Sequence, residues 1–347
     1  MLPIEDLKHV FTQTETLWNQ LQGKTIFLSG GTGFVGTWLL ESFLYANQAL
    51  SLQAKMVVLS RDPDVFFKKH PHLKDEKSLA FIKGDVRSFA EPEGAFDYAF
   101  HAAVDPAASL GGSQALDAFD VSVAGTKRVL ELCKTKKVKK VLFVSSGAVY
   151  GKQPADITHV EETYAGAPDL SKSSSMYGEG KRVGELMSRQ YGQTYGFDVS
   201  IARLFAFVGP GLPLDGHYAV GNFIRNILSG ENICIKGDGS AKRSYMYASD
   251  MAIWLWHILF RGESFAAYNV GSDKELSILQ LAKKIISIEN PKLEVVVQGA
   301  STGNLSGDLY VPSVKKAASD LGLRLSVPDD AALKKTIEFY KKTAEAQ

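Results

Sequence analysis

The stretch TIFLSGGTGFVG, residues 25–36, decides the fold class of this chain. Its apolar start predicts a buried strand, after which Gly30, Gly33 and Gly36 lead into an apolar helical pattern at 37–48. Such glycines let the backbone approach a pyrophosphate, whose charge is met by the free amides at the start of the helix. The spacing G-x-x-G-x-x-G is one residue longer than the common dinucleotide fingerprint. The stretch therefore predicts a phosphate-binding turn, with a purely structural strand-to-helix turn as the alternative.

Short β-branched segments alternate with longer helical patterns from residue 24 onward. This alternation is typical of βαβ units and of a mostly parallel sheet. Strands are expected at 25–29, 55–60, 79–85, 96–103, 140–151 (running into a turn) and 198–205, and helices at 37–48, 114–135, 174–195, 277–288 and 329–345. The sequence therefore predicts an α/β fold, a Rossmann-type doubly wound parallel sheet with a smaller C-terminal α/β substrate-binding lobe.

The chain divides into three expected parts. An NAD(P)-binding Rossmann domain is expected at 24–205, with 238–276 returning to it, and the substrate-binding lobe at 206–237 and 277–347. Residues 1–23 are expected to form a helical extension, an amphipathic helix with its apolar side chains on one face. Those apolar side chains are Ile4, Leu7, Val10, Phe11, Leu17 and Leu21.

Composition excludes several classes of protein. The 347 residues carry 39 Lys and Arg against 38 Asp and Glu, so no overall positive charge attracts nucleic acid or an anionic membrane. The longest apolar run, at 252–260, is far shorter than the ~20 residues that cross a bilayer. Glu5 and Asp6 lie where a signal peptide would be apolar, and the two cysteines, Cys133 and Cys234, lack metal-ligand spacing. We expect a cytoplasmic protein without a metal site and without nucleic-acid or membrane partners.

Three polar residues are candidates for catalysis. Tyr177 and Lys181 form a Tyr-x-x-x-Lys pair, whose side chains lie one turn apart on the expected helix. A tyrosine hydroxyl, with a pKa of ~10, is a poor base at neutral pH unless a nearby cation such as Lys181 favours its ionised form. Ser146 lies near the end of an expected strand, where strand ends face a ligand crevice. The alternative is an ordinary surface Tyr and Lys on a helix.

The glycine turn, the strand-end serine and the Tyr-x-x-x-Lys pair, in this order, resemble the short-chain dehydrogenase/reductase superfamily. The glycine spacing and the length point to its extended branch, the NAD-dependent epimerase/dehydratase family of nucleotide-sugar modifying enzymes. The resemblance covers about residues 24–325. Further matching stretches are KGDV (83–86), HAAVDPAAS (101–109), AGTKRVLE (124–131), SSGAVYG (145–151), IARLFAFVGPG (201–211), IKGDGSAKRSYMYASDMA (235–252) and YNVGS (268–272).

The resemblance implies roles for the candidate residues. Tyr177 would be the acid or base at a sugar hydroxyl or ketone, Lys181 would lower its pKa and hold the nicotinamide ribose, and Ser146 would hydrogen-bond the reacting oxygen. Arg243 matches the arginine that pairs with the diphosphate of a sugar nucleotide. Asn222 is expected to supply the substrate-binding amide that relatives often place where this chain has an alanine. Two neighbouring side chains that could read the sugar or the base are His217 and Tyr218.

The resemblance also implies a dinucleotide cofactor. The expected contact residues are Gly30, Gly33, Phe34, Val35 and Gly36 at the diphosphate, Asp85 and Val86 at the adenine, Ala102 and Ala103 beside the ribose and diphosphate, and Tyr177 and Lys181. The strand at 55–60 ends at a position where NAD-using members commonly have an Asp on the ribose 2′-hydroxyl. Ser60 and Arg61 there favour a 2′-phosphate, whereas Asp62 favours NAD. We expect NAD(P), with NADP favoured.

Departures from the family pattern bear on the reaction. Dehydratases and decarboxylases of this branch have acidic residues after the serine or threonine, where this chain has Gly147 and Ala148. Neither side chain can transfer a proton, so we expect hydride transfer at sugar C4, by a 4-epimerase or a 4-keto reductase. A dehydratase or decarboxylase that draws its acid from Glu161, Glu162 or Asp105 is the alternative, and a non-catalytic cofactor-binding regulator is a further one.

Many members of the branch pack two helices from each subunit into a four-helix bundle. The matching helices here are those expected at 114–135 and 174–195. By this analogy alone we expect a homodimer that binds a nucleotide-diphosphate sugar.

Overall fold

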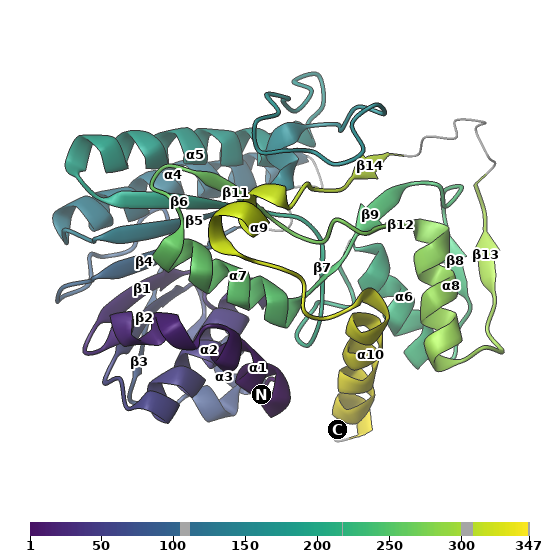
Figure 1. The fold of residues 1–347 in the computed structure, drawn as a ribbon, viewed down its shortest axis with the longest axis horizontal. Helices are drawn as coiled ribbons and strands as arrows, with labels where there is room; N and C mark the ends of the chain where they lie inside the picture. Colours follow the sequence, from purple (N-terminus) through teal and green to yellow (C-terminus); the bar gives the residue numbers. More distant parts are fainter. Residues whose placement is uncertain (105–111, 217, 300–307, 346–347) are drawn as a thin grey trace.

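A parallel sheet of seven strands forms the centre of the computed structural model, which describes residues 1–104, 112–216, 218–299 and 308–345 (Figure 1). Its strands are β1 (Thr25–Ser29), β2 (Lys55–Ser60), β3 (Leu79–Lys83), β4 (Tyr98–His101), β5 (Lys140–Ser146), β6 (Asp198–Leu204) and β11 (Ala267–Val270). They lie in the order β11-β6-β5-β4-β1-β2-β3, and all neighbouring pairs are parallel. The predicted Rossmann-type sheet is confirmed.

The strand order reverses between β1 and β4. The chain runs outward from β1 through β2 to β3, and then returns to the other side of β1 as β4. Ser29 and His101 are partners in register at the ends of these two strands. In open α/β sheets, ligands bind beyond the carboxyl ends of the strands at such a switch point. The topology therefore predicts a ligand site at the residues that follow Ser29 and His101.

Helices cover both faces of the sheet, because successive strand residues point to opposite sides. Ile26 and Leu28 of β1 belong to the apolar core under one set of helices, whereas Phe27 belongs to the core under the other. On the first face lie α1 (Ile4–Gln13), α2 (Phe34–Leu50), α3 (Pro63–Lys69) and α7 (Ala248–Arg261), and on the second lie α4 (Gly112–Thr135) and α5 (Ser175–Tyr195) (Figure 1). The sheet is thus buried on both sides.

The predicted strands and helices agree with the structure apart from their ends. Helix α2 begins at Phe34 rather than at 37, because Gly33 is the extended N-cap residue. Strands β3 and β4 are shorter than predicted, and the strand at 140–151 ends at Ser146, where a 3-10 turn, η4 (Gly147–Tyr150), follows.

The N-terminal extension was expected to form one helix, but it forms two short ones. Helix α1 ends at Gln13, and the 3-10 helix η1 (Glu15–Leu21) follows. Thr14 interrupts the helix, because its backbone has left the helical region at φ −118° and ψ 10°. Ile4 was expected on the apolar face and is 49% exposed. The expected apolar residues that are buried are Leu7, Val10, Leu17 and Leu21.

The C-terminal part forms small sheets beside three helices. Its strands are β7 (Phe207–Val208), β8 (Ile233–Ile235), β9 (Lys242–Ser244), β10 (Met246–Tyr247), β12 (Glu275–Ser277), β13 (Val295–Val297) and β14 (Leu309–Tyr310), paired as β10-β7, β12-β9-β14 and β13-β8. Helices α6 (Ala219–Leu228), α8 (Ile278–Glu289) and α10 (Asp329–Glu345) share one apolar cluster. Helix α9 (Lys315–Leu321) instead packs through Ala317 into the core beneath the main sheet. The domain boundaries given above stay a prediction.

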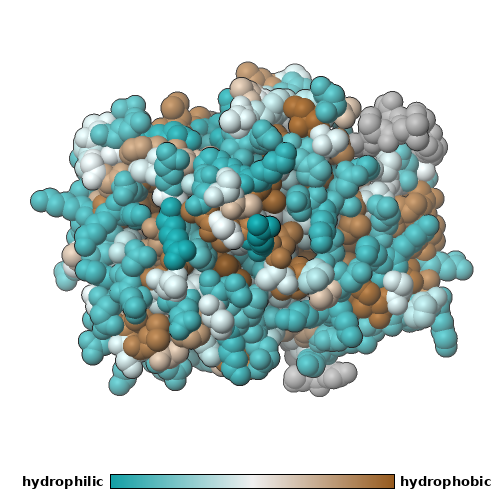
Figure 2. Space-filling view, in the orientation of Figure 1, coloured by the Kyte–Doolittle hydropathy of each residue, from teal (hydrophilic) through white to brown (hydrophobic). Residues whose placement is uncertain are grey.

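Hydrophilic side chains dominate the face shown in Figure 2, and apolar residues lie on it in small separate groups. In the part of the chain that the structure describes, no helix combines the length and the apolar character needed to cross a bilayer.

Candidate functional site

The glycine turn lies at the switch point of the sheet, directly against the end of β4. Gly30 has φ +77°, and a Cβ atom on it would lie 2.5 Å from the carbonyl carbon of Ala102. Gly36 is equally restricted, because a Cβ there would lie 2.3 Å from the carbonyl oxygen of Gly30. Only glycine fits these two positions, since the backbones of β1, β4 and α2 meet there.

Gly33 differs from the other two glycines of the motif. Among the described atoms, only the Gly30 oxygen, at 3.6 Å, lies within 4 Å of a Cβ placed on Gly33. Gly33 is also the N-cap of α2, and among the described residues no side chain caps this helix. The first amides of the helix therefore lack a capping side chain, and the positive end of the helix dipole lies behind them. This cradle fits the diphosphate of a dinucleotide.

The end of β2 carries the residues expected at the adenosine ribose. The Ser60 hydroxyl is buried and donates to the hydroxyl of Thr32 at 3.3 Å. Arg61 follows at the surface, and its charge contributes to lowering the pKa of Asp85. Asp62 caps α3, where its carboxylate accepts the amide of Val65 at 3.3 Å. The Asp62 carboxylate is thus engaged in the fold rather than aimed at the crevice.

Asp85, expected beside the adenine, is held by an arginine two residues later. The guanidinium of Arg87 donates to it at 2.7 and 2.9 Å, and the Arg87 amide donates at 2.8 Å. These bonds lower the pKa of Asp85 to about 2. Val86 is buried, and it packs so closely on α4 that a Cβ on Gly125 would lie 2.7 Å from it.

Ala102 and Ala103 follow β4 at the crevice. The Ala102 amide donates to the carbonyl of Ser29 at 3.0 Å, which continues the sheet pairing past the end of β4. The preceding His101 is buried between the hydroxyls of Ser29, at 2.7 Å, and Thr126, at 2.9 Å. Burial lowers the pKa of His101 to about 3, so it is a neutral part of the core at physiological pH.

The structure brings Ser146 and Tyr177 together, although about thirty residues separate them. Ser146 ends β5, and its hydroxyl accepts the amide of Ala148 at 3.2 Å. Tyr177 lies in the first turn of α5. Burial raises the pKa of Tyr177 to about 12, and a side-chain hydrogen bond with Ser146 opposes this rise. The hydroxyls of Ser146 and Tyr177 therefore lie next to each other at the carboxyl end of the sheet.

Lys181 lies one turn after Tyr177 and is almost fully buried. Its ammonium group donates to the carbonyl of Val144 at 2.9 Å. Burial lowers the pKa of Lys181 to about 8. Burial is the largest influence on the pKa of Tyr177 and Ser146 opposes it, and the lowering of this pKa by Lys181 stays a prediction.

The residue motifs missed a second tyrosine at this place. Tyr310 of β14 lies beside Ser146 and Tyr177, since Ser146 lowers the pKa of Tyr310 and Tyr177 raises it. Its ring packs on Phe205, with centroids 4.7 Å apart. Burial raises the pKa of Tyr310 well above its usual value, so the phenol stays protonated. No local spacing signals this residue, because it arrives from the far end of the chain.

Tyr310 also explains why position 147 carries no side chain. A Cβ on Gly147 would lie 2.7 Å from the Tyr310 hydroxyl and 2.7 Å from the ring of Phe205. An acidic side chain at this position would have to displace both aromatic residues. The place next to Ser146 is thus occupied by a phenol in this chain.

The alternative acids lie elsewhere or outside the described residues. The carboxylate of Glu162 accepts the amide of Asn269 at 2.8 Å, on the edge strand β11. Burial raises its pKa, with Arg203 as a nearby opposing charge. Glu161 is exposed. Asp105 lies outside the residues that the structure describes.

Of the expected substrate residues, Arg243 lies beside the candidate catalytic group. Its guanidinium carbon is 5.8 Å from the ring centroid of Tyr310, and it donates to the carbonyls of Lys242 and Asp308 at 2.8 and 2.7 Å. Asn222, on α6, instead donates to the carbonyl of Gly216 at 3.1 Å and so braces its own loop.

Tyr218 is the N-cap residue of α6 and is 55% exposed. It lies close enough to Tyr177 to raise the pKa of that residue. The adjacent His217 is outside the described part of the chain.

Several known proteins resemble this chain. It is 28% identical to UDP-glucuronic acid decarboxylase 5 of Arabidopsis thaliana over 272 residues, 78% of this chain and 76% of the relative. It is 26% identical to the dTDP-D-glucose 4,6-dehydratase of Bos taurus over 331 residues, 92% of this chain and 89% of the relative.

Solved structures share the fold. The UDP-glucose 4-epimerase of Thermotoga maritima, solved with UDP-glucose, superposes with a TM-score of 0.76 at 21% identity, covering 92% of this chain and 99% of the epimerase. The dTDP-glucose 4,6-dehydratase of Bacillus anthracis, solved with NAD, superposes with a TM-score of 0.75 at 20% identity, covering 93% and 98% of the two chains.

The comparisons do not support the expected preference for NADP. The dehydratase structure contains NAD, and the matching family is described as NAD dependent. That match covers residues 26–271, from the first strand and its glycine turn to the end of the seven-stranded sheet. This chain therefore belongs to the NAD dependent epimerase/dehydratase family, the extended short-chain dehydrogenase/reductases that modify nucleotide sugars.

Proposed function

We propose that this protein is an NAD(P)-dependent nucleotide-sugar enzyme that transfers hydride at sugar C4, as a 4-epimerase or a 4-keto reductase. When bound, the nicotinamide supplies the acceptor or donor of the hydride. Tyr177 moves the proton at the C4 oxygen, Ser146 hydrogen-bonds that oxygen, and Lys181 holds positive charge nearby. Arg243 is the proposed partner of the substrate diphosphate, and Asn222 stays a weaker proposal because its amide braces a loop.

The raised pKa of Tyr177 bears on the direction of proton transfer. With a pKa of about 12, the phenol is protonated at neutral pH and suits donation to a ketone oxygen. Acting as a base requires a positive charge close to the phenol, since an adjacent cation favours the phenolate. The proposal assigns this charge to Lys181 together with the bound cofactor.

The packing at Gly147 is the observation that favours epimerisation or reduction at C4 over dehydration. The Tyr310 hydroxyl and the Phe205 ring fill the space that an acidic side chain would need. Removal of a C5 proton together with loss of water at C6 calls for acid and base groups beyond the Tyr-Ser pair. Epimerisation or reduction at C4 needs no further group.

A decarboxylase is the second candidate, and the similarity to UDP-glucuronic acid decarboxylases favours it. Oxidation of a uronic acid at C4 yields a β-keto acid, which loses carbon dioxide readily. Like a dehydratase, a decarboxylase in this chain would draw its assisting acid from outside position 147. A dehydratase would need an acid from Glu161, Glu162 or Asp105.

For the cofactor, we propose NAD(P) bound along the carboxyl ends of β1, β2, β3 and β4. The proposed contacts are Gly30, Gly33, Phe34, Val35, Gly36, Ser60, Arg61, Asp85, Val86, Ala102, Ala103, Tyr177 and Lys181. Fluorescence titrations with NAD and NADP, run side by side, measure the preference directly. Tighter binding of NADP would support a 2′-phosphate at Ser60 and Arg61.

Product analysis tests the proposed reaction. The protein is incubated with UDP- and dTDP-linked hexoses, uronic acids and 4-keto sugars, and the products are read by mass spectrometry and NMR. The proposal predicts an isomer of unchanged mass or a reduced sugar, whereas loss of carbon dioxide supports the decarboxylase and loss of water the dehydratase.

The variant Tyr177→Phe should lose about 10²–10⁴-fold in turnover, the usual contribution of a general acid or base. Tyr195→Phe is the matched control, because Tyr195 ends the same helix and is 47% exposed. Turnover within a few-fold of wild type in Tyr177→Phe would rule out the proposed role.

A further inference from the structure

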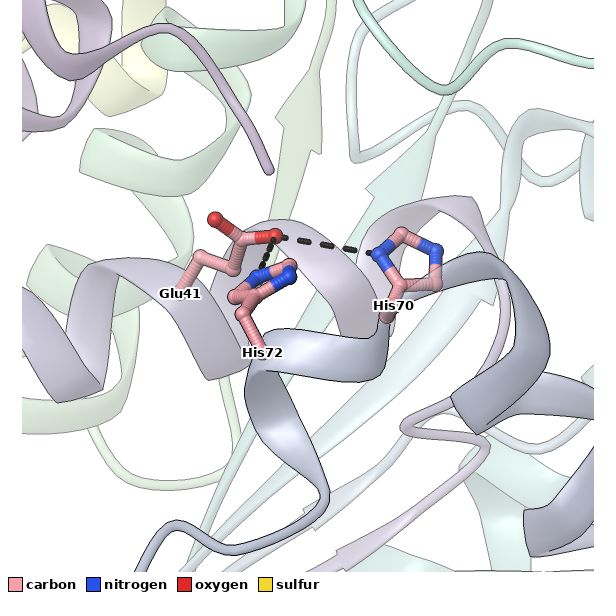
Figure 3. Close-up of side chains that lie close together, drawn as sticks. All are labelled: Glu41, His70 and His72. Carbon is pink, nitrogen blue, oxygen red and sulfur yellow. Dashed lines mark hydrogen bonds and ion pairs between the residues drawn. The ribbon is translucent and has the colours of Figure 1, made fainter.

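Three potential metal ligands meet on the face of the sheet that α2 covers, far along the chain from the catalytic residues (Figure 3). Glu41 comes from α2, His70 follows α3, and His72 lies in the 3-10 helix η2 (Pro71–Leu73). One ligand atom from each lies within 4.8 Å of the others. No metal site was expected from the sequence, because the carboxylate lies on one element and the imidazoles on others.

The Glu41 carboxylate is oriented by the fold. Its side chain is 3% exposed, and Oε2 accepts the amide of Leu2 at 3.0 Å. The other oxygen, Oε1, points to both imidazoles, at 3.2 Å from Nε2 of His72 and 3.8 Å from Nδ1 of His70 (Figure 3). Anchoring one oxygen of a carboxylate in this way presents the other to a ligand.

The Nδ1 atom of His70 is buried, and within the described residues it has no hydrogen-bond partner. Its distance of 3.8 Å to the carboxylate is too long for a hydrogen bond. The imidazole stacks on Phe66, with centroids 4.5 Å apart and an angle of 26° between the planes. Buried polar atoms normally have a bonding partner. We therefore expect a further group between the His70 nitrogen and the Glu41 carboxylate.

We propose that this cluster binds a divalent transition-metal ion of the zinc class, through Nδ1 of His70, Nε2 of His72 and Oε1 of Glu41. Two imidazoles and one carboxylate are a common zinc ligand set, with water as the fourth ligand. Bonds of about 2.1 Å in a tetrahedral site separate the ligand atoms by about 3.4 Å. The two separations from the carboxylate oxygen, 3.2 and 3.8 Å, bracket this value, and the two imidazole nitrogens lie within 4.8 Å of each other. Magnesium and calcium prefer all-oxygen sites and fit less well.

The bound ion would tie α2 to the segment that follows α3. Helix α3 begins directly after Ser60 and Arg61, so the ion holds the far end of the helix that starts at the proposed ribose site. It touches none of the proposed catalytic residues. The assignment is therefore independent of the reaction that the enzyme performs.

Zinc titration of the full-length protein tests the proposal. The protein is stripped with a chelator and dialysed, and Zn²⁺ binding is measured by competition with a chromophoric chelator. We expect one equivalent per chain in the wild type. His70→Gln and His72→Gln should each weaken binding by about tenfold or more, since removal of supporting groups alone costs ten- to hundredfold. His159→Gln, at a half-buried histidine elsewhere, should bind as the wild type does.

Thermal unfolding gives a second measure, because a ligand that binds only the native state raises Tm. Zn²⁺ should raise Tm in the wild type and in His159→Gln, but not in the double variant His70→Gln/His72→Gln. Equal affinity for Zn²⁺ in the wild type and the double variant, or no binding by the wild type, would overturn the proposal. Should the variants fail to fold, the Co²⁺ spectrum of the wild type decides alone. An intense tetrahedral spectrum supports the site, and a weak octahedral spectrum contradicts it.

Discussion

Gly147 shows how a single position restricts the chemistry of this site. Its missing side chain leaves room for the hydroxyl of Tyr310, which lies beside Ser146 and Tyr177. Ser146 and Tyr177 could be predicted because each lies in a local motif. Tyr310 could not, since a two-residue strand at the far end of the chain has no pattern of its own and only the folded topology delivers it.

We predict that Gly147→Ala impairs both stability and turnover. The new Cβ would lie 2.7 Å from two aromatic groups, and overpacking of this kind costs about 1–3 kcal/mol. Urea denaturation measures the loss, with Gly237→Ala as the control, because within the described part of the chain no other atom is found within 4 Å of a Cβ there. Adding Tyr310→Phe should recover part of the stability. An unperturbed Gly147→Ala would contradict the packing described.

Lys181 should make stability depend on pH. Burial lowers its pKa from 10.5 to about 8, so between these values the unfolded chain binds a proton that the native chain does not. The free energy of unfolding therefore rises with pH over this window, by up to about 3 kcal/mol, and the penalty of burying the charge is complete below pH 8. Denaturation at about pH 7.5, just below this window, and at about pH 9.5, inside it, should show the rise in wild type and not in Lys181→Met. Parallel pH curves for the two proteins would refute the burial of this charge.

At the scale of elements, the hydrophobic patterns located the main strands and most helices. The glycine turn, the strands and α5 follow from local periodicity, and their ends shifted where a cap residue such as Gly33 intervened. The N-terminal extension departed from the prediction because the backbone of Thr14 leaves the helical region and so divides it. Helix α1 and η1 nevertheless cover α7, where the rings of Trp18 and Trp256 lie 4.8 Å apart.

We predict that the N-terminal extension is part of the cooperative core. Trp18 is fully buried, so Trp18→Ala should lower the free energy of unfolding by about 3–5 kcal/mol. Ile4→Ala is the control from the neighbouring helix, because Ile4 is 49% exposed and should change stability by about 0.5 kcal/mol or less. Denaturant titration followed by circular dichroism checks both. A loss below about 1 kcal/mol for Trp18→Ala would show that the extension is only loosely attached.

At the scale of the whole molecule, α4 and α5 lie side by side on one face and expose large apolar residues. Leu116 of α4 is 65% exposed and Leu186 of α5 is 69% exposed. A second copy that packs on these helices would bury both, which supports the homodimer expected from the sequence. Leu186→Lys should then shift sedimentation toward the monomer. Leu170→Lys, at a loop leucine that is 83% exposed, should not. A wild type that sediments as a monomer at all concentrations would contradict the dimer.

The proposed reaction is 4-epimerisation or 4-keto reduction, and a deuterium label at C4 follows its hydride. The enzyme is given NAD(P) and nucleotide sugars that carry deuterium at C4, and the products are examined by NMR and mass spectrometry. We expect the deuterium at C4 of the inverted sugar or on the nicotinamide ring, without loss of water or carbon dioxide. Deuterium that stays at C4 of unchanged substrate across the whole panel, or a product that has lost water, would contradict it.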